Sequence, residues 1–173
     1  MEKLLKICER AGIKTSPERV DDIWIVPLFS WYDSTLGSKD PLTKADIEEL
    51  KKWSDLYFCK WPKGFKPLDL YERNEDFINN FDLMDASPIL SFSHMLPRRE
   101  LLSPRDELTH KFLPHVVGSS RLEKQIRALG SHTHMFGHSH INKDVTIEGI
   151  RYVQNALGYP REREQYDYTP RFV

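Results

Sequence analysis

The segment GSHTHMFGHSH, residues 130–140, contains four of the seven histidines of the chain: His132, His134, His138 and His140. Within it, THMF is a short strand candidate, and Gly137 comes directly before the last two histidines. Their i, i+2 spacing places both rings on one face of an extended backbone, whereas a tight turn would splay them toward two centres. Gly137 would allow a close backbone approach or a positive φ. Because neutral imidazole suits Zn, Fe, Mn and Ni, the segment is a candidate metal site.

The sequence on either side of this segment predicts a helix before it and a strand pair after it. Residues 119–130, SSRLEKQIRALG, have an apolar helical stripe, and Ser120 with Glu123 forms a capping box at its start. Residues 143–156, KDVTIEGIRYVQNA, predict two short strands that meet in a turn at Glu148–Gly149.

Further strands are expected upstream. Residues 89–92, ILSF, have buried-strand character and end just before His94, and residues 23–32, IWIVPLFSWY, are apolar almost throughout. Pro27 argues for an edge position or a bulge in the earlier strand. Residues 2–13, EKLLKICERAGI, predict an amphipathic helix. Because strands and helices alternate, we expect a layered α/β domain.

The segment from about 37 to 81 interrupts this alternation. It is polar and aromatic and is broken by several prolines. Thr43 with Asp46 predicts the capped start of one helix, and residues 74–84, NEDFINNFDLM, predict a second. We interpret the segment as a peripheral helical insertion and not as a separate domain.

The totals limit the function classes. At 173 residues the chain is about one domain long, and we expect residues 1–160 to form it, with a polar tail at 161–173. The net charge of -1 gives no electrostatic case for nucleic acid or an anionic membrane. The sequence has no apolar run of about 18 residues that would span a bilayer. The two cysteines match no CxxC pattern, so we expect an intracellular, cytoplasmic protein.

Three histidines follow predicted strands. His94 comes after the strand at 89–92, and His138 and His140 come after THMF. Functional groups of α/β folds gather at the carboxyl ends of strands, so we expect these three imidazoles to meet at one sheet edge. His134 lies on the strand itself, and we expect it to support a metal ligand instead of binding metal.

The remaining histidines are expected to be structural. His110 and His115 sit in no motif, and His132 is expected to cap the helix or face solvent. A zinc site made from all four histidines of residues 130–140 is a weaker alternative, because four ligands within nine residues would strain a tetrahedral shell.

The motif GHSH after a strand, with an upstream strand that ends in SH, resembles the C-terminal half of the calcineurin-like metallophosphoesterases. The resemblance covers most of the chain. It implies a partial β-sandwich flanked by helices (αββα layers), two metal ions at one edge, and hydrolysis of phosphate mono- or diesters. It also implies that His94 and His138 bind one metal and that His140 binds the other, without distinguishing Mn, Fe, Zn and Mg.

Three further motifs of that family, D-x-H, G-D-x-x-D and G-N-H-D or G-N-H-E, are absent from the sequence. They would supply the remaining ligands and the group that protonates the leaving oxygen. The resemblance therefore implies an incomplete half domain that is inactive alone, needs the missing half or a partner, and contains no assigned catalytic residue. Asp33 and Asp85 are the acids considered as accidental extra ligands. The alternative function is a non-catalytic metal-binding or interaction module.

Overall fold

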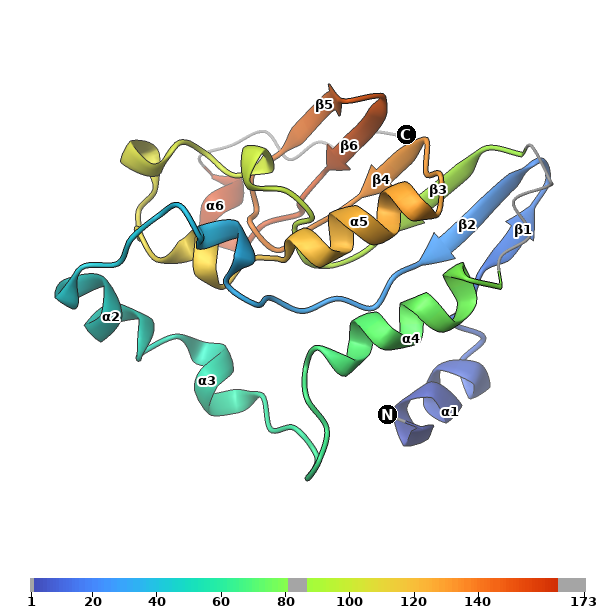
Figure 1. Ribbon diagram of the computed structural model, residues 1–173, viewed down its shortest axis with the longest axis horizontal. Coiled ribbons are helices and arrows are strands. Elements are labelled where there is room, and N and C mark those ends of the chain that lie inside the picture. The colour runs from blue at the N-terminus through green and yellow to red at the C-terminus, as the bar shows by residue number, and fades with distance from the viewer. Residues whose placement is uncertain (1, 81–86, 165–173) are drawn as a thin grey trace.

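The computed structural model describes residues 2–80 and 87–164, which form one six-stranded sheet with helices packed against it (Figure 1). The strand order is β1-β2-β3-β4-β6-β5; the outer pairs are antiparallel and the inner pairs parallel. No helix in the described ranges is long and apolar enough to cross a membrane. The strands are β1 Glu18–Val20, β2 Ile23–Pro27, β3 Ile89–Phe92, β4 Thr133–Met135, β5 Lys143–Ile147 and β6 Ile150–Gln154.

Helices α5 and α4 cover one face of the sheet and lie side by side (Figure 1). Leu122 and Ile126 of α5 and Tyr71 of α4 pack in one core with Val26 and Tyr152 of the strands. Burying an apolar side chain of this size contributes about 1.5–3 kcal/mol, so this layer holds the sheet in place. The helices are α1 Glu2–Arg10, α2 Lys44–Leu50, α3 Ser54–Phe58, α4 Asp69–Ile78, α5 Ser120–Ala128 and α6 Pro160–Arg163.

The parallel register brings the carboxyl ends of β2, β3 and β4 to the same edge. Pro27, Phe92 and Met135 align across these strands. Adjacent residue rows face opposite sides, so the row that holds His134 is buried under the helices, whereas Phe92 on the other face is 39% exposed. The α/β fold class is confirmed, and the described residues contain one sheet of the partial sandwich that we expected.

Pro27 ends β2, so the strand is shorter than the predicted range 23–32. Trp24 and Leu28 donate backbone hydrogen bonds to the β3 side. Since alternate residues point their N–H groups to opposite sides, the nitrogen of Pro27 faces the β1 side. On that side β1 pairs only with Ile23–Ile25 and does not extend to Pro27. The missing N–H of Pro27 therefore costs no hydrogen bond between the strands. The edge expectation therefore holds locally, although β2 has neighbours on both sides.

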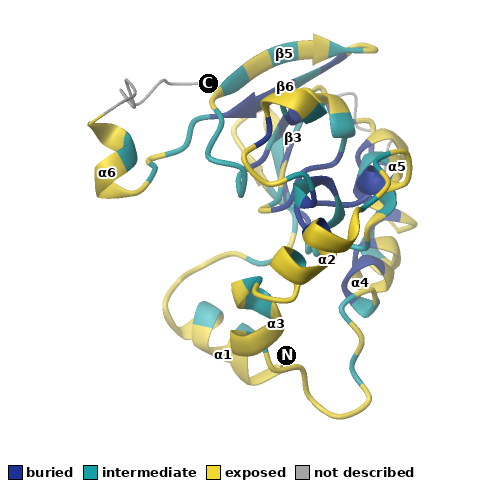
Figure 2. Ribbon diagram, turned by 90° about the vertical axis from the view of Figure 1, so that its left-hand side faces the viewer, coloured by how far each residue is buried: buried dark blue, intermediate teal, exposed yellow. Residues whose placement is uncertain are grey.

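The region expected to be a peripheral insertion has two different parts. α2 and α3 are largely exposed, whereas α4 buries Tyr71, Asn74 and Ile78 (Figure 2). The Asn74 side chain exchanges hydrogen bonds with the backbone of Phe29 and donates to Gln125 of α5. A wholly peripheral insertion is therefore wrong, because α4 belongs to the core.

Local signals located most elements and missed some boundaries. The capping box of Thr43 and Asp46 is present, and both turn residues at Glu148–Gly149 have positive φ, as a tight hairpin requires. The N-cap of α5 is Ser119 and not Ser120.

The helix predicted at 74–84 is displaced toward the N-terminus. It forms as α4 and stops at Ile78, and residues 81–86 lie outside the described residues. Leu70 and Tyr71, before Asn74, are buried apolar side chains of α4, so packing against the core sets its start.

Candidate metal centre

Two of the three predicted ligands meet at the carboxyl edge of the sheet. His94 Nε2 and His138 Nδ1 are 3.1 Å apart, and the ring centroids are 5.0 Å apart. His140 is close enough to influence the pKa of His94 electrostatically. We call His94, His138 and His140 the histidine edge. The loops after β3 and β4 therefore bring together side chains that are more than forty positions apart in the sequence.

The GHSH segment forms a tight, strained turn. His138 and His140 both adopt left-handed backbone conformations, with φ of 69° and 56°. A left-handed conformation costs a non-glycine residue of the order of 1 kcal/mol, and such strain concentrates at functional sites. Gly137 does not itself have a positive φ. It donates its N–H to the His94 carbonyl, and a Cβ there would lie 3.4 Å from His94 Nδ1. The close approach predicted for Gly137 is present, and the unusual φ values fall on the histidines.

The surroundings of His138 fix its proton and keep the ring neutral. Its Nε2 lies 3.2 Å from the Val116 carbonyl oxygen, which can only accept, so Nε2 carries the proton and Nδ1 keeps its lone pair. Burial, and then the neighbouring His94, lowers the pKa of His138. Burial is also the main cause that lowers the pKa of His94. Both rings therefore favour the neutral form that binds metals.

His134 is fully buried behind this edge. Its Nδ1 is 2.8 Å from Ser91 Oγ, and its Nε2 is 3.1 Å from Ser93 Oγ. Because Ser93 donates its own hydroxyl proton to the Met95 carbonyl, Nε2 of His134 must be the donor to Ser93. Burial lowers the pKa of His134 to about 3. This neutral ring thus anchors Ser93, the residue immediately before His94, while making no contact of its own with the predicted ligands.

A carboxylate that the sequence did not reveal holds His140. Nδ1 of His140 is 3.1 Å from Oε2 of Glu162, and the Tyr159 ring lies 4.9 Å from the imidazole. The same oxygen accepts the N–H of Tyr159, which is the main reason that the pKa of Glu162 is lowered; the bond to His140 adds to it. Glu162 belongs to α6, at the start of the segment expected to be a polar tail; residues 165–173 lie outside the described residues.

A second carboxylate reaches the site from the insertion. Asp55 accepts a hydrogen bond from Trp53 Nε1 at 3.1 Å, and the Trp53 ring lies 6.4 Å from the His138 ring. The charge of Asp55 partly opposes the lowering of the pKa values of His94 and His138. No sequence motif marks Asp55, because only the fold of the insertion brings it here.

The acids that we considered from the sequence do not take this place. Asp33 is hydrogen-bonded to Thr35 and is paired with Arg121 at 3.2 Å. Asp85 lies outside the described residues.

The other histidines are engaged elsewhere. His110 lies 3.2 Å from a carboxylate oxygen of Glu49, and His115 Nε2 lies 2.8 Å from the Asp40 carbonyl. His132 lies in the turn after α5, where its backbone N–H donates to Ile89 at the start of β3. The structure therefore does not gather the four histidines of residues 130–140 into one site.

The donors of the histidine edge fit part of a metal shell. Two nitrogens bound to one tetrahedral zinc, each at about 2.0–2.1 Å, lie about 3.3 Å from each other, close to the separation between His94 and His138. In the described part of the chain, however, no three His, Cys, Asp or Glu side chains are grouped closely enough to hold an ion. The residues thus suit a borderline cation but leave its shell incomplete.

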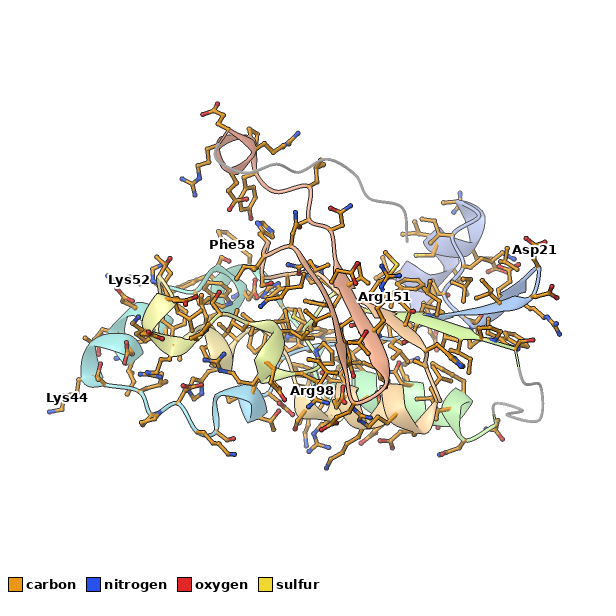
Figure 3. The ribbon with its side chains drawn as sticks, turned by 90° about the horizontal axis from the view of Figure 1, so that it is seen from above. Asp21, Lys44, Lys52, Phe58, Arg98 and Arg151 are labelled. Atoms are coloured by element: carbon orange, nitrogen blue, oxygen red, sulfur yellow. The ribbon has the colours of Figure 1, made fainter. Side chains whose placement is uncertain are left out.

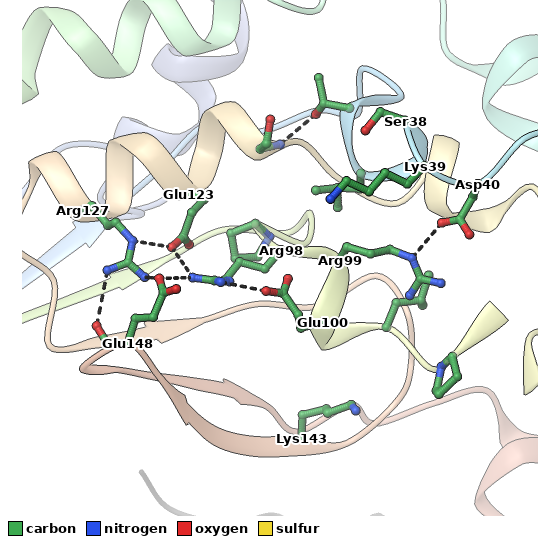
Figure 4. A pocket seen from close by; sticks show the side chains of 16 residues that line it. Ser38, Lys39, Asp40, Arg98, Arg99, Glu100, Glu123, Arg127, Lys143 and Glu148 are labelled. Carbon is green, nitrogen blue, oxygen red and sulfur yellow. Dashed lines mark hydrogen bonds and ion pairs between the residues drawn. The ribbon is translucent and has the colours of Figure 1, made fainter.

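A cavity lies elsewhere, between α5, the loop after β3, residues 35–40 and the β5–β6 hairpin. It has a volume of about 910 Å³ and contains an ionic group that we call the Arg98 cluster (Figure 4). Arg98 pairs with three carboxylates at 2.7–2.9 Å, and Arg127 shares two of them. The members are Arg98, Glu100, Glu123, Arg127 and Glu148. Each carboxylate in the cluster is paired with at least one arginine, so the cluster joins α5, the loop after β3 and the β5–β6 hairpin.

Comparison with known proteins gives one consistent relationship. No family model matches the chain. The chain is 23% identical over 174 residues to the acyl-carrier-protein phosphodiesterase PptH of Mycobacterium tuberculosis, an alignment that covers 92% of this chain and 52% of the relative. The crystal structure of phosphopantetheinyl hydrolase (PptH) from the same organism superimposes with a TM-score of 0.73 at 21% identity, covering 96% of this chain and 63% of that one. The chain shares this fold and spans about half the length of the curated relative.

Proposed function

We propose that this chain supplies the histidine side of a metal-dependent phosphoester hydrolase that acts on phosphodiesters. The observation that carries the proposal is the 3.1 Å approach of His94 Nε2 and His138 Nδ1 at the carboxyl edge. Such convergence is expected when two rings share one cation. The similarity to a phosphodiesterase over nearly the whole chain supports the reaction class.

In this proposal His94 and His138 hold one divalent ion and His140 holds a second. When bound, such ions would polarise the phosphoryl oxygens and lower the pKa of water. The Val116 carbonyl keeps the lone pair of His138 on Nδ1, and His134 holds Ser93 and thereby the loop that carries His94.

Glu162 orients His140 in the same way. Its carboxylate accepts the proton of Nδ1, which leaves Nε2 of His140 for a cation. Carboxylate–histidine pairs of this kind fix the tautomer and raise the basicity of the ligand nitrogen.

The remaining ligands are proposed to come from chain outside these 173 residues. Three neutral imidazoles bring no negative charge to offset two dications, and hard ions such as Mn and Mg prefer carboxylate oxygens. That the curated relative is about twice as long supports this division. Alone, the chain is expected to bind one borderline ion such as Zn weakly and to show no hydrolysis.

The competing candidate is a non-catalytic metal-binding or interaction module. It is favoured by the observation that the described residues gather no complete ligand group. Under that function, an extended protein would bind metal through the same histidines but would not turn over phosphate esters.

Assays of two proteins separate these candidates. The 173-residue chain and a protein extended by the upstream coding sequence are each incubated with Zn or Mn and bis(p-nitrophenyl) phosphate. We expect turnover by the extended protein alone, lost in His140→Ala. Metal binding without turnover in the extended protein would favour the interaction module. Turnover by the 173-residue chain that depends on His138 would show that its own acids complete the site.

A further inference from the structure

A cleft of about 540 Å³ opens between the loop after β2 and the insertion that carries α3. The rings of Trp31 and Trp61 meet edge to face inside it, with centroids 5.0 Å apart. Small-molecule sites have volumes of this order and are lined mainly by apolar and aromatic side chains, with a few polar groups. We call it the aromatic cleft; its apolar walls are Trp31, Tyr32, Leu56, Trp61, Pro67 and Leu68.

The aromatic cleft adjoins the histidine edge through two residues of the insertion. Trp53 lies over His138 and donates its indole N–H to Asp55. Asp55 lines the cleft and also acts electrostatically on His94 and His138. Trp53 and Asp55 therefore connect the cleft to the histidine edge.

The charges in the cleft exclude an anion from it. Asp55 lines it, has no ion pair with a described residue and would repel a phosphate, whereas Asp33, also in the lining, is paired with Arg121. Oδ2 of Asp55 accepts from Trp53, whereas no described residue donates to its Oδ1, which leaves an acceptor for an N–H or O–H group. Burial, and then the charge of Asp55, raises the pKa of Tyr32 to about 12, so its hydroxyl remains protonated and can donate.

We propose that the aromatic cleft binds the uncharged organic arm of a phosphodiester substrate, while the phosphate lies at the histidine edge. The arm is a flexible chain of methylenes and secondary amides, as in the phosphopantetheine group named for the relatives. The aromatic walls cover the methylenes, Asp55 accepts an amide or hydroxyl proton, and the Tyr32 hydroxyl donates to an amide carbonyl. This inference rests on the proposed function, and it assigns the substrate class to a separate subsite.

Binding of the arm alone tests the inference without any hydrolysis. The probe is S-methylpantetheine, which lacks the phosphate and cannot form a mixed disulfide with Cys59 of the cleft. Saturation-transfer NMR and tryptophan fluorescence on the full chain should show binding that 10 mM inorganic phosphate does not displace. Trp61→Ala should raise the Kd about fivefold or more, since the variant loses an aromatic contact surface.

Two variants keep the result independent of misfolding. Phe58→Ala is the matched control, because Phe58 lies on α3 but is 82% exposed and does not line the cleft (Figure 3). It should bind like the parent. Leu68→Ala trims the opposite wall and should weaken binding as Trp61→Ala does, with an unchanged circular dichroism spectrum.

Equal affinity in Trp61→Ala, Leu68→Ala and the parent would overturn the inference, as would the absence of saturation transfer at millimolar probe. Acrylamide quenching of Trp61 fluorescence in the ligand-free extended protein gives a further test. Protection of Trp61 there would also overturn the inference, because another segment of the protein would then fill the cleft. The proposed function fails separately: it predicts hydrolysis of bis(p-nitrophenyl) phosphate, which lacks the arm and should not depend on Trp61.

Discussion

His94 and Arg98 are four positions apart, yet they belong to regions with opposite chemistry. In the Arg98 cluster the Arg98 side chain is only 12% exposed and is surrounded by three carboxylates, two of which also pair with Arg127. At the histidine edge the rings of His94 and His138 are kept neutral and face one another, and two left-handed residues hold the turn.

The difference separates a region whose charged side chains are already paired from the region where we propose the metal site. The larger cavity lies beside the Arg98 cluster, where each charge already has a partner. At the histidine edge, in contrast, Nδ1 of His138 keeps a lone pair that a cation could take. We therefore expect the Arg98 cluster to contribute to stability, whereas the strained turn of the histidine edge serves the proposed metal site. The following experiments separate the two.

The largest effect is expected from His138→Ala in the upstream-extended protein. His138 is one of the two histidines proposed to hold the same ion. Removing it should lower kcat/KM for bis(p-nitrophenyl) phosphate by about 10³-fold or more, which matches the several kcal/mol that polarisation by a metal supplies. The free energy of unfolding should change by no more than about 1 kcal/mol, because the residue is strained and half-buried. A variant that keeps a tenth of the activity would place the reaction elsewhere.

Arg98→Gln should give the converse result. Removing the cation takes one of two arginine partners from the partly buried Glu123 and breaks the pairs with Glu100 and Glu148, and we expect a loss of about 2–3 kcal/mol in urea unfolding. Zinc affinity measured by calorimetry should not change. Arg151→Gln is the matched control: its pair with Asp144 is nearly half exposed and should contribute less than about 1 kcal/mol. If Arg98→Gln weakened metal binding more than it weakened folding, the two regions would not be independent.

The stability of the protein should depend on pH through His134. Its pKa is about 3 in the folded protein against 6.5 for an ordinary histidine, so between these values the unfolded chain binds more protons. The free energy of unfolding should therefore rise with pH through this window, level off above it, and fall by about 2 kcal/mol from pH 7 to pH 5.

His134→Gln should flatten that dependence in urea titrations at several pH values. His132→Gln, which changes an exposed ring two positions away, should keep it. Identical slopes in the parent and His134→Gln would mean that the buried ring is not the source.

The smallest effect is expected at Glu162, the carboxylate that faces a histidine instead of an arginine. Glu162→Gln should weaken binding of the second zinc ion, the one proposed for His140, about tenfold in the upstream-extended protein, as loss of an orienting partner commonly does. The ¹⁵N shifts of His140 in metal-free protein should also show a mixed tautomer. Glu164→Gln, two positions along and exposed, is the control. An unchanged tautomer would indicate that Glu162 only caps α6.

Much of this arrangement could be predicted from local patterns. Periodicity located β3, β4, the hairpin and α5, and the positions of His94 and His138 after apolar strands were enough to place both at one edge. The adjacent serines 119 and 120 are chemically alike, so the pattern could not tell which one caps α5.

The two carboxylates near the site could not be predicted because no motif marks them. Asp55 lies near His138 because the exposed insertion folds over this edge and Trp53 links the two residues. Glu162 contacts His140 because the segment after β6 turns back toward it. Both depend on contacts between residues distant in the sequence. The sequence also suggested Gly137 as the residue with positive φ, whereas the turn places that strain on His138 and His140.

The most direct test of the shared metal site is a zinc titration of the ¹⁵N-histidine-labelled chain, followed by imidazole NMR. We expect the resonances of His94 and His138 to shift together at one equivalent, with His138 bound through Nδ1, while those of His110 and His115 stay in place. The double variant His94→Ala/His138→Ala should show no such binding. Zinc that shifts other histidines, or that binds the double variant equally well, would contradict the account.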